Sequence, residues 1–223
     1  MELLELQNGR SQFADRLALF EAIARDIEEK GFSINPAALP LDMTSALIEH
    51  LDYMSDKQFH RAGIGRDQAY MHNGFVRSDA ICWITGNSQA GQQWLHWADE
   101  LKKYLNRRLF LGLFSFESHF AHYQPGDFYR RHRDAFQGEA NRVLSIVVYL
   151  NANWHPEDGG ELELFLNDDE REGLKVTPGQ GTVVAFLSED FPHQVLPATR
   201  DRYSIAGWYR VNTSSTEKID PPT

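Results

Sequence analysis

The sequence predicts a mainly β protein with N-terminal helices, in which the strands form a sandwich, a barrel or a jelly roll. Apolar residues recur at helical spacing through the first half of the chain. Short runs of β type follow residue 108, separated by the turn motifs QPGD, EDGG and PGQG. The 223 residues fit a single domain. We expect helical support over about 13–106, a jelly-roll or related β core over about 108–212 and a flexible tail at 213–223.

Three helices are expected ahead of the strands. The first covers residues 13–30, where apolar side chains return every three or four positions, and Gly31 is suited to end it. A second helix follows the proline-punctuated connector NPAALPLD, with Asp42 or Thr44 as its N-cap. A third helix covers residues 89–106, which again show helical spacing of large apolar side chains.

A long surface loop is expected between the second and third helices. The segment 62–74 is polar, contains glycines and has no steady period, and loops of this length often close over a functional site. Five strands are expected after the third helix, and the second of them is apolar on both faces, which is typical of a strand buried on both sides. They cover residues 110–123, 143–151, 162–166, 182–187 and 202–211.

The composition excludes several classes of protein. There are 32 Asp and Glu residues against 22 Lys and Arg, so the chain lacks the basic surface that nucleic-acid binding requires. The single cysteine, Cys82, excludes a disulfide scaffold or a thiolate metal cage and fits a reducing cytoplasm. No apolar run approaches the ~20 residues that span a bilayer, and the N-terminus has no signal-peptide pattern. We expect a soluble, cytoplasmic protein with no nucleic-acid or membrane partner.

A candidate metal site begins with the motif H-x-D formed by His132 and Asp134. Side chains two residues apart on a strand project from the same face, so these two can grip one ion. His193, in the segment FPHQV ahead of the last strand, is the candidate third ligand. Two histidines and one carboxylate form the facial triad of non-haem Fe(II) oxygenases. The alternative is that His132 and Asp134 form an ordinary surface pair in the polar stretch RRHRD.

A candidate anion site lies on the last expected strand. Arg202 and Ser204 share a face of this apolar strand, and a buried arginine needs an anionic partner. Its planar fork suits a carboxylate, and the Ser204 hydroxyl can add a hydrogen bond. Tyr149 lies in an otherwise apolar strand and also needs a polar partner, so a dicarboxylate would satisfy both. The alternative for Arg202 is a surface ion pair with Asp201 or Glu189.

Several ordered motifs are similar to those of the 2-oxoglutarate- and Fe(II)-dependent oxygenases. They are VRSDAICWI, HYQPGDFYRRHRD, RVLSIVVYLNANW, EDGGELELF and FPHQVLPATRDRYSIAGWYR, and they extend over about residues 74–209. The chain resembles in particular the prolyl hydroxylase branch, which includes the animal hypoxia-inducible-factor prolyl hydroxylases and their bacterial relatives. The resemblance implies a double-stranded β-helix, which is a jelly-roll barrel with helices against one sheet, as a single catalytic domain over 1–223.

The resemblance also implies roles for individual residues, carried over by position. The iron ligands would be His132, Asp134 and His193. The cosubstrate residues would be Arg202 for the distal carboxylate of 2-oxoglutarate, Tyr149 as its hydroxyl partner, and the pocket tyrosines Tyr123 and Tyr129. The substrate contacts would be Arg77, Asp79, Arg142 and Trp208, under a lid formed by the 62–74 loop. His119 stands where the animal enzymes carry an apolar pocket residue, so cosubstrate affinity is expected to differ.

The implied activity is that of a peptidyl-proline (procollagen-proline type) dioxygenase. It would use Fe(II), 2-oxoglutarate and O2, with ascorbate in a supporting role, and would give hydroxyproline, succinate and CO2. Bacterial relatives suggest a loop proline of elongation factor Tu as the substrate. The alternatives are an oxygenase acting on another protein residue or a small molecule, a non-catalytic jelly-roll binding module, and a zinc hydrolase. The oligomeric state is not predicted.

Overall fold

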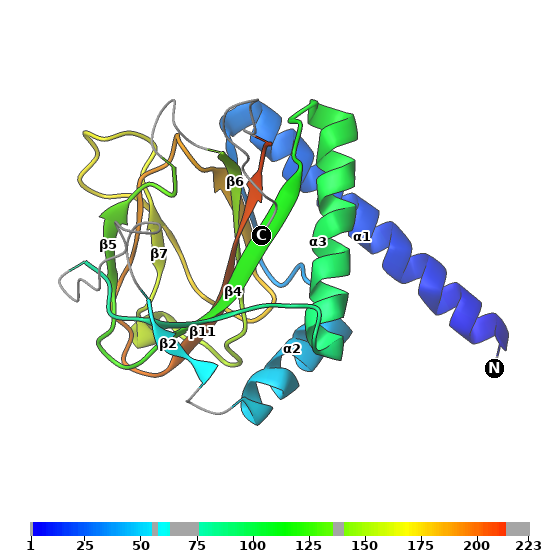
Figure 1. Ribbon diagram of the computed structural model, residues 1–223, viewed down its shortest axis with the longest axis horizontal. Helices are drawn as coiled ribbons and strands as arrows, with labels where there is room; N and C mark the ends of the chain where they lie inside the picture. The colour runs from blue at the N-terminus through cyan, green and yellow to red at the C-terminus, as the bar shows by residue number, and fades with distance from the viewer. Residues whose placement is uncertain (1, 55–57, 63–75, 136–140, 213–223) are drawn as a thin grey trace.

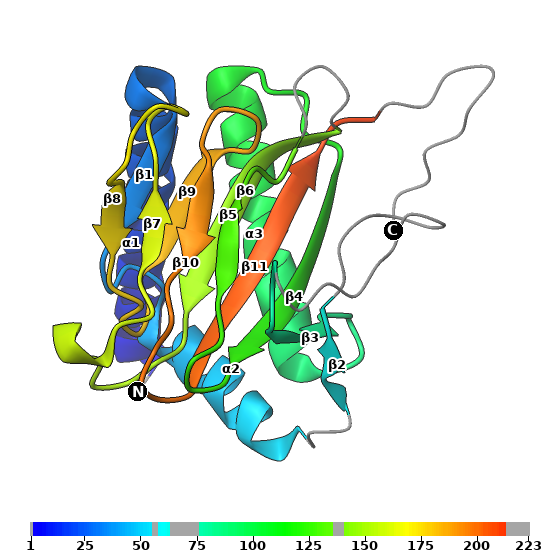
Figure 2. The same cartoon turned by 90° about the vertical axis from the view of Figure 1, so that its left-hand side faces the viewer.

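A computed structural model describes residues 2–54, 58–62, 76–135 and 141–212, and for residues 2–12 only the backbone. Two antiparallel sheets face each other, and three helices cover the outer face of the larger sheet (Figure 1). The smaller sheet lies in front of the larger one in Figure 2. This arrangement confirms the expected mainly β fold with N-terminal helices. Most of the expected 62–74 loop and the whole 213–223 tail lie outside the described residues.

The larger sheet has seven strands, and the smaller sheet has four. In spatial order, the larger sheet contains β1 (Phe32–Asn35), β9 (Val183–Leu187), β6 (Arg142–Tyr149), β11 (Arg202–Arg210), β4 (Ser115–Tyr123), β3 (Ala80–Trp83) and β2 (His60–Arg61). The smaller sheet contains β5 (Tyr129–His132), β10 (His193–Val195), β7 (Leu162–Leu164) and β8 (Leu174–Val176), and a short 3-10 helix covers Pro156–Asp158.

The helices are α1 (Glu2–Lys30), α2 (Leu41–Tyr53) and α3 (Gln89–Leu109). Gly31 follows α1 with φ 80°, a conformation that glycine adopts without strain, as expected. The expected N-caps of α2 were wrong, because the helix begins one residue before Asp42 and Pro40 occupies the cap position. The Thr44 hydroxyl instead donates back to the Pro40 carbonyl over 2.9 Å. None of the described helices is long and apolar enough to cross a membrane.

Two layers of apolar side chains hold these elements together. The first lies between the helices and the larger sheet, where Trp94 and Trp97 of α3 are fully buried and stack with ring centroids 5.4 Å apart. The second lies between the two sheets and includes Tyr123 and Tyr149. Burial of apolar area on both faces of the larger sheet is the main stabilising contribution. The inner layer also places the polar side chains of the larger sheet opposite the smaller sheet.

The long strands were predicted better than the short ones. The central strands β4, β9 and β11 fall within expected segments and β6 begins one residue before its segment, whereas strands of two to four residues such as β2, β3 and β10 were missed. The strand expected from residue 110 starts only at Ser115, because Phe110 adopts φ 56° as the C-cap of α3. The amide side chain of Asn106 then holds the turn by hydrogen bonds of 2.8 and 2.7 Å to the backbone of Leu113.

Candidate active site

The three predicted metal ligands converge between the two sheets. His132 ends β5 and His193 begins β10, and these two strands pair with His132 directly opposite His193. Asp134 lies beyond the end of β5. The turn that follows the strand brings Asp134 to the histidines, whereas we expected His132 and Asp134 to alternate along a single strand. One ligand atom from each residue lies within 4.8 Å of the others. The surface-pair alternative for His132 and Asp134 is therefore wrong.

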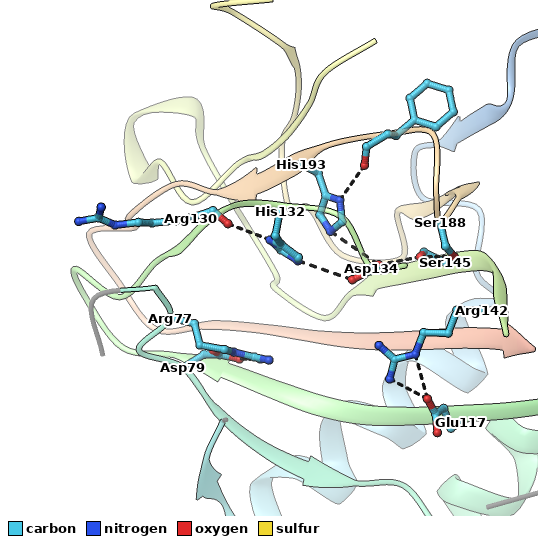
Figure 3. A network of polar contacts seen from close by, with 11 residues as sticks. Arg77, Asp79, Glu117, Arg130, His132, Asp134, Arg142, Ser145, Ser188 and His193 are labelled. Carbon is cyan, nitrogen blue, oxygen red and sulfur yellow. Dashed lines mark hydrogen bonds and ion pairs between the residues drawn. The ribbon is translucent and has the colours of Figure 1, made fainter. Parts of the chain in front are cut away.

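Backbone carbonyls orient both histidines. His132 Nδ1 lies 2.8 Å from the carbonyl oxygen of Arg130, and His193 Nδ1 lies 3.1 Å from that of Phe191 (Figure 3). When both Nδ1 atoms donate a proton to these carbonyls, both Nε2 atoms carry the free lone pair. These Nε2 atoms lie 3.5 and 3.7 Å from the two carboxylate oxygens of Asp134. The two Nε2 atoms and the carboxylate oxygens are therefore directed at one common position.

The carboxylate of Asp134 is held ionised. Burial alone would raise its pKa, but the neighbouring charge of His193, the hydrogen bond from His132 and the hydroxyl of Ser145 outweigh burial and hold the pKa well below its usual range. Burial, together with the proximity of His132, lowers the pKa of His193 to about 4. At neutral pH the cluster thus offers a carboxylate and a neutral His193 imidazole, the form in which histidine binds a metal.

Two buried serines fix the position of Asp134, and the sequence reasoning missed both. The Ser145 hydroxyl donates to Asp134 Oδ2 over 2.6 Å and lies 2.9 Å from the hydroxyl of Ser188 (Figure 3). Because Ser145 has a single proton, Ser188 is the donor in the second bond. The available signal was Ser145 itself, a polar residue within the apolar run of β6.

Ser145→Ala is expected to weaken metal binding by about 10- to 100-fold, because the substitution frees the carboxylate that this hydroxyl orients. Calorimetric titration with Mn(II) measures the effect. Ser188→Ala is the matched control, since it leaves the direct bond from Ser145 to Asp134 in place, and its effect should be smaller. Equal Mn(II) affinity in the Ser145→Ala variant and the wild type would contradict the orienting role.

Arg202 is a buried cation without a carboxylate partner among the described residues. Only 1% of the residue is exposed, and its Nε donates to the Gly160 carbonyl over 2.8 Å while one terminal nitrogen donates to Ser204 over 3.3 Å. Asp201 contacts His122 instead, with 2.7 Å between His122 Nε2 and Oδ1. The surface ion pair considered for Arg202 is therefore wrong, and its remaining donors are free to meet an anion.

Tyr149 and Tyr123 enclose the Arg202 guanidinium. The Arg202 Cζ atom lies 5.1 Å from the ring centroid of Tyr149 and 4.9 Å from that of Tyr123. The Tyr149 hydroxyl is buried and has no hydrogen-bond partner among the described residues. Burial raises the pKa of Tyr149 to about 12, although the charge of Arg202 opposes this effect, so the hydroxyl remains a donor. An orphaned donor beside an uncompensated cation fits the far carboxylate of 2-oxoglutarate.

Tyr129 and Arg77 stack in sequence on the metal ligand His132. The Tyr129 ring lies parallel to the His132 ring with 3.6 Å between centroids, and the Arg77 guanidinium covers Tyr129 at 4.4 Å. Arg77 in turn grips Asp79 through two hydrogen bonds of 2.7 and 2.6 Å. Burial alone would lower the pKa of Arg77, but the hydrogen bonds and the charge of Asp79 outweigh it and raise the pKa. The ion pair with Asp79 holds Arg77 against Tyr129, and Tyr129 in turn holds the His132 ring in place.

Asp79→Asn is expected to lower the free energy of unfolding by about 3–5 kcal/mol, because it leaves the buried Arg77 charge uncompensated. The side chains of Arg77 and Asp79 are only 10% and 0% exposed. Urea denaturation measures the change. Asp168→Asn is the matched control, since it breaks the exposed Arg133–Asp168 pair, in which Asp168 is 67% exposed, and should cost at most about 1 kcal/mol. Similar losses from both variants would contradict this account.

The other two predicted substrate residues, Arg142 and Trp208, contact each other. The Arg142 guanidinium lies 3.8 Å from the centroid of the Trp208 ring. It also donates to Glu117 Oε1 over 3.1 and 2.7 Å (Figure 3). Trp208 is 8% exposed, and its Nε1 has no partner among the described residues. Glu117, which sequence reasoning did not single out, thus fixes Arg142. That Arg142 and Trp208 contact substrate remains a prediction.

Known proteins are similar to this chain in sequence and in fold. The family model of the 2OG-Fe(II) oxygenase superfamily matches residues 118–210. The solved structure of a Pseudomonas putida prolyl-4-hydroxylase is 39% identical, with a TM-score of 0.77, and the match covers 86% of this chain and 98% of that one. A Trichoplax adhaerens prolyl hydroxylase solved with a hypoxia-inducible-factor peptide is 25% identical, with a TM-score of 0.78 and coverage of 89% and 92%. Mouse prolyl hydroxylase EGLN3 is 29% identical over 167 residues, 69% of each chain.

The chain belongs to the 2OG-Fe(II) oxygenase superfamily, as its fold, its donor set and these matches agree. Within the superfamily it is a member of the prolyl hydroxylase branch. Enzymes of this family require Fe(II), 2-oxoglutarate and O2, and the group formed by His132, Asp134 and His193 has the donor types of the facial triad.

Proposed function

We propose that this protein hydroxylates a proline residue within a protein substrate and converts 2-oxoglutarate and O2 to succinate and CO2. The observation that carries the proposal is the combination of the His132, Asp134 and His193 cluster with the buried Arg202, which has no carboxylate partner among the described residues, in a chain 39% identical to a prolyl-4-hydroxylase. A metal site alone would also fit a hydrolase. The anion site between Arg202 and Tyr149 is what favours a 2-oxoglutarate enzyme.

In this proposal the triad holds Fe(II), which together with 2-oxoglutarate and O2 supplies the oxidant that inserts oxygen into a C–H bond. The chain's own part is orientation. Arg202 binds the far carboxylate of 2-oxoglutarate in bidentate fashion, and the Tyr149 hydroxyl and Ser204 add hydrogen bonds to the same end. Holding that end fixes how far the keto acid reaches toward the triad.

The remaining pocket residues shape the site around the reacting groups. Tyr123 closes one side of the Arg202 guanidinium, and its buried position keeps water from the carboxylate. Tyr129 packs flat on His132 and keeps this ligand from rotating. Trp208 pairs with Ser145 on the larger sheet under Arg142, and Arg77, held by Asp79, packs on Tyr129. In this proposal the substrate proline would enter beside these residues. Exclusion of water protects a reactive intermediate from side reactions.

Elongation factor Tu is the proposed substrate, because the chain resembles bacterial prolyl hydroxylases associated with that protein. A proline in an exposed loop could enter an open pocket, whereas a proline within a helix or strand could not without local unfolding. The second candidate is a 2-oxoglutarate oxygenase acting on another protein residue or on a small molecule. A nogalamycin-pathway epimerase has the same fold at 14% identity and a TM-score of 0.61, so the fold alone does not select the substrate.

Mass spectrometry of elongation factor Tu tests the proposal. The factor is incubated with the protein, Fe(II), 2-oxoglutarate and air, with the His132→Ala variant as the control. We expect the mass of one oxygen atom to be added at a loop proline, and only with the wild-type protein. Succinate formation without modification of the factor would overturn this substrate and favour the second candidate. Modification that is equal with the His132→Ala variant would overturn the role of the triad.

A further inference from the structure

A buried histidine outside the triad, His119, lies between two tryptophans on the inner face of the larger sheet. His119 is on β4, where it pairs with Trp83 of β3 on one side and with Ala206 of β11 on the other. Its ring meets the Trp83 ring edge-on at 5.3 Å and 88°, and the Trp208 ring at 5.4 Å and 59°. We call Trp83, His119 and Trp208 the aromatic wall.

The aromatic wall lies at the metal end of the site and not at the cosubstrate end. His119 precedes Tyr123 by four residues along β4, about 14 Å at the rise of an antiparallel strand, and Tyr123 is the residue that pairs with Arg202. Trp208 instead pairs with Ser145, whose hydroxyl binds the metal ligand Asp134. His119 is thus displaced from the proposed 2-oxoglutarate carboxylate, and this distance argues against an effect of His119 on cosubstrate affinity.

The His119 ring is neutral and anchored. It is 3% exposed, and Nδ1 lies 3.2 Å from the carbonyl oxygen of Phe120. Burial, together with the nearby charge of Arg77, lowers its pKa to about 4, although the charge of Asp79 opposes the shift. A neutral ring can pack edge-on against an indole without desolvating a charge. The contact therefore fixes how the two tryptophans stand relative to each other.

The two tryptophans differ in solvent exposure. Trp208 is only 8% exposed and is covered by Arg142, whereas Trp83 is 52% exposed although it stands on the inner face of the sheet. A large exposed indole beside an enzyme site provides a flat apolar contact of high value for a peptide. Its orientation is set by the edge-on contact with His119, because both residues occupy opposite positions of adjacent strands.

We propose that His119 is a positioning residue for the protein substrate, which orients Trp83 and Trp208 so that the aromatic wall binds an apolar residue next to the target proline. The inference rests on the proposed function, since it assigns a recognition element to the same site. Side chains that pack flat on an indole are the class this wall would select, such as leucine, methionine or a second proline. Charged side chains would lose hydration against the exposed indole of Trp83.

The variant His119→Leu removes the ring and keeps an apolar side chain of similar size, whereas His119→Phe retains a ring between the tryptophans. His122→Leu is the matched control, because His122 lies on the opposite face of β4 and stacks on Tyr203 at 4.4 Å. We expect His119→Leu to weaken peptide binding at least tenfold and His119→Phe to recover most of it. The affinity for 2-oxoglutarate should stay within twofold in all three variants.

Binding is measured without turnover, using Mn(II)-loaded protein with 2-oxoglutarate under nitrogen. The probe is an array of nine-residue peptides with a central proline and varied neighbours, against matched peptides with alanine at the centre. Wild-type protein should select proline with an apolar neighbour, and His119→Leu should lose the preference for the neighbour. If His119→Leu keeps the preference for an apolar neighbour, or if it loses 2-oxoglutarate affinity and not peptide affinity, the role of His119 is wrong. The proposed function would still stand. If wild-type protein shows no preference for proline, the proposed protein-substrate function fails and the inference falls with it.

Discussion

Asp134→Ala is expected to abolish 2-oxoglutarate turnover while the protein stays folded. Asp134 is the one carboxylate of the described cluster, and it lies within 3.7 Å of the Nε2 atoms of His132 and His193. Its removal leaves two imidazole ligands and no carboxylate, and this pair binds a divalent ion far more weakly. We expect metal affinity to fall by more than about 100-fold, beyond the loss typical of an orienting residue. Succinate formation and Mn(II) calorimetry measure the two effects.

The control for this variant is Asp168→Ala, which removes an exposed carboxylate paired with Arg133, next to the ligand His132. It should retain turnover and metal binding. Circular dichroism of both variants checks that the sheets remain folded. A fully active Asp134→Ala variant would contradict the assignment of the triad, whatever the behaviour of the control.

The second large effect is expected for Arg202→Ala, which should chiefly weaken 2-oxoglutarate binding. A charge-assisted bidentate contact contributes about 2–3 kcal/mol, which corresponds to a rise of roughly 30- to 150-fold in the dissociation constant. Metal affinity should be unchanged, because Arg202 belongs to the Tyr149 end of the site and contacts no ligand of the triad. Titration of the Mn(II)-loaded protein with 2-oxoglutarate measures the change.

Arg200→Ala is the matched control for Arg202→Ala. It removes an arginine two residues away whose side chain is 46% exposed and pairs with Asp158 at the surface. The cosubstrate affinity of this control should equal that of the wild type. An Arg202→Ala variant that binds 2-oxoglutarate with wild-type affinity would mean that the anion is held elsewhere.

The parts of the fold that the sequence predicted are those with long, regular patterns. The alternation along β4 and the mostly apolar sequence of β6 are local signals, and both strands lie in the expected segments to within one residue. Short strands such as β5 and β10 carry too few residues to show a period, and pairing with distant segments decides their structure. The same limit explains the second helix, whose start at Leu41 depends on the backbone of Pro40 and not on a capping side chain.

In the candidate site, too, local features were predicted and contacts between distant segments were not. The H-x-D motif and the buried arginine could be recognised locally, and the expectation that Arg202 is buried without a surface ion pair is confirmed. The convergence of His193 with His132 comes from the pairing of β5 with β10, which no local pattern encodes. The Ser145–Ser188 support of Asp134 likewise joins residues 43 positions apart. Contacts of this kind are set by tertiary packing.

The most direct test of the account is a crystal structure of the protein with Mn(II) and 2-oxoglutarate, grown without oxygen. We predict one metal ion bound by His132 Nε2, His193 Nε2 and the Asp134 carboxylate. We also predict that the far carboxylate of 2-oxoglutarate is held by the Arg202 guanidinium and the Tyr149 hydroxyl. A metal ion bound by other residues, or a cosubstrate carboxylate directed away from Arg202, would contradict the central claim.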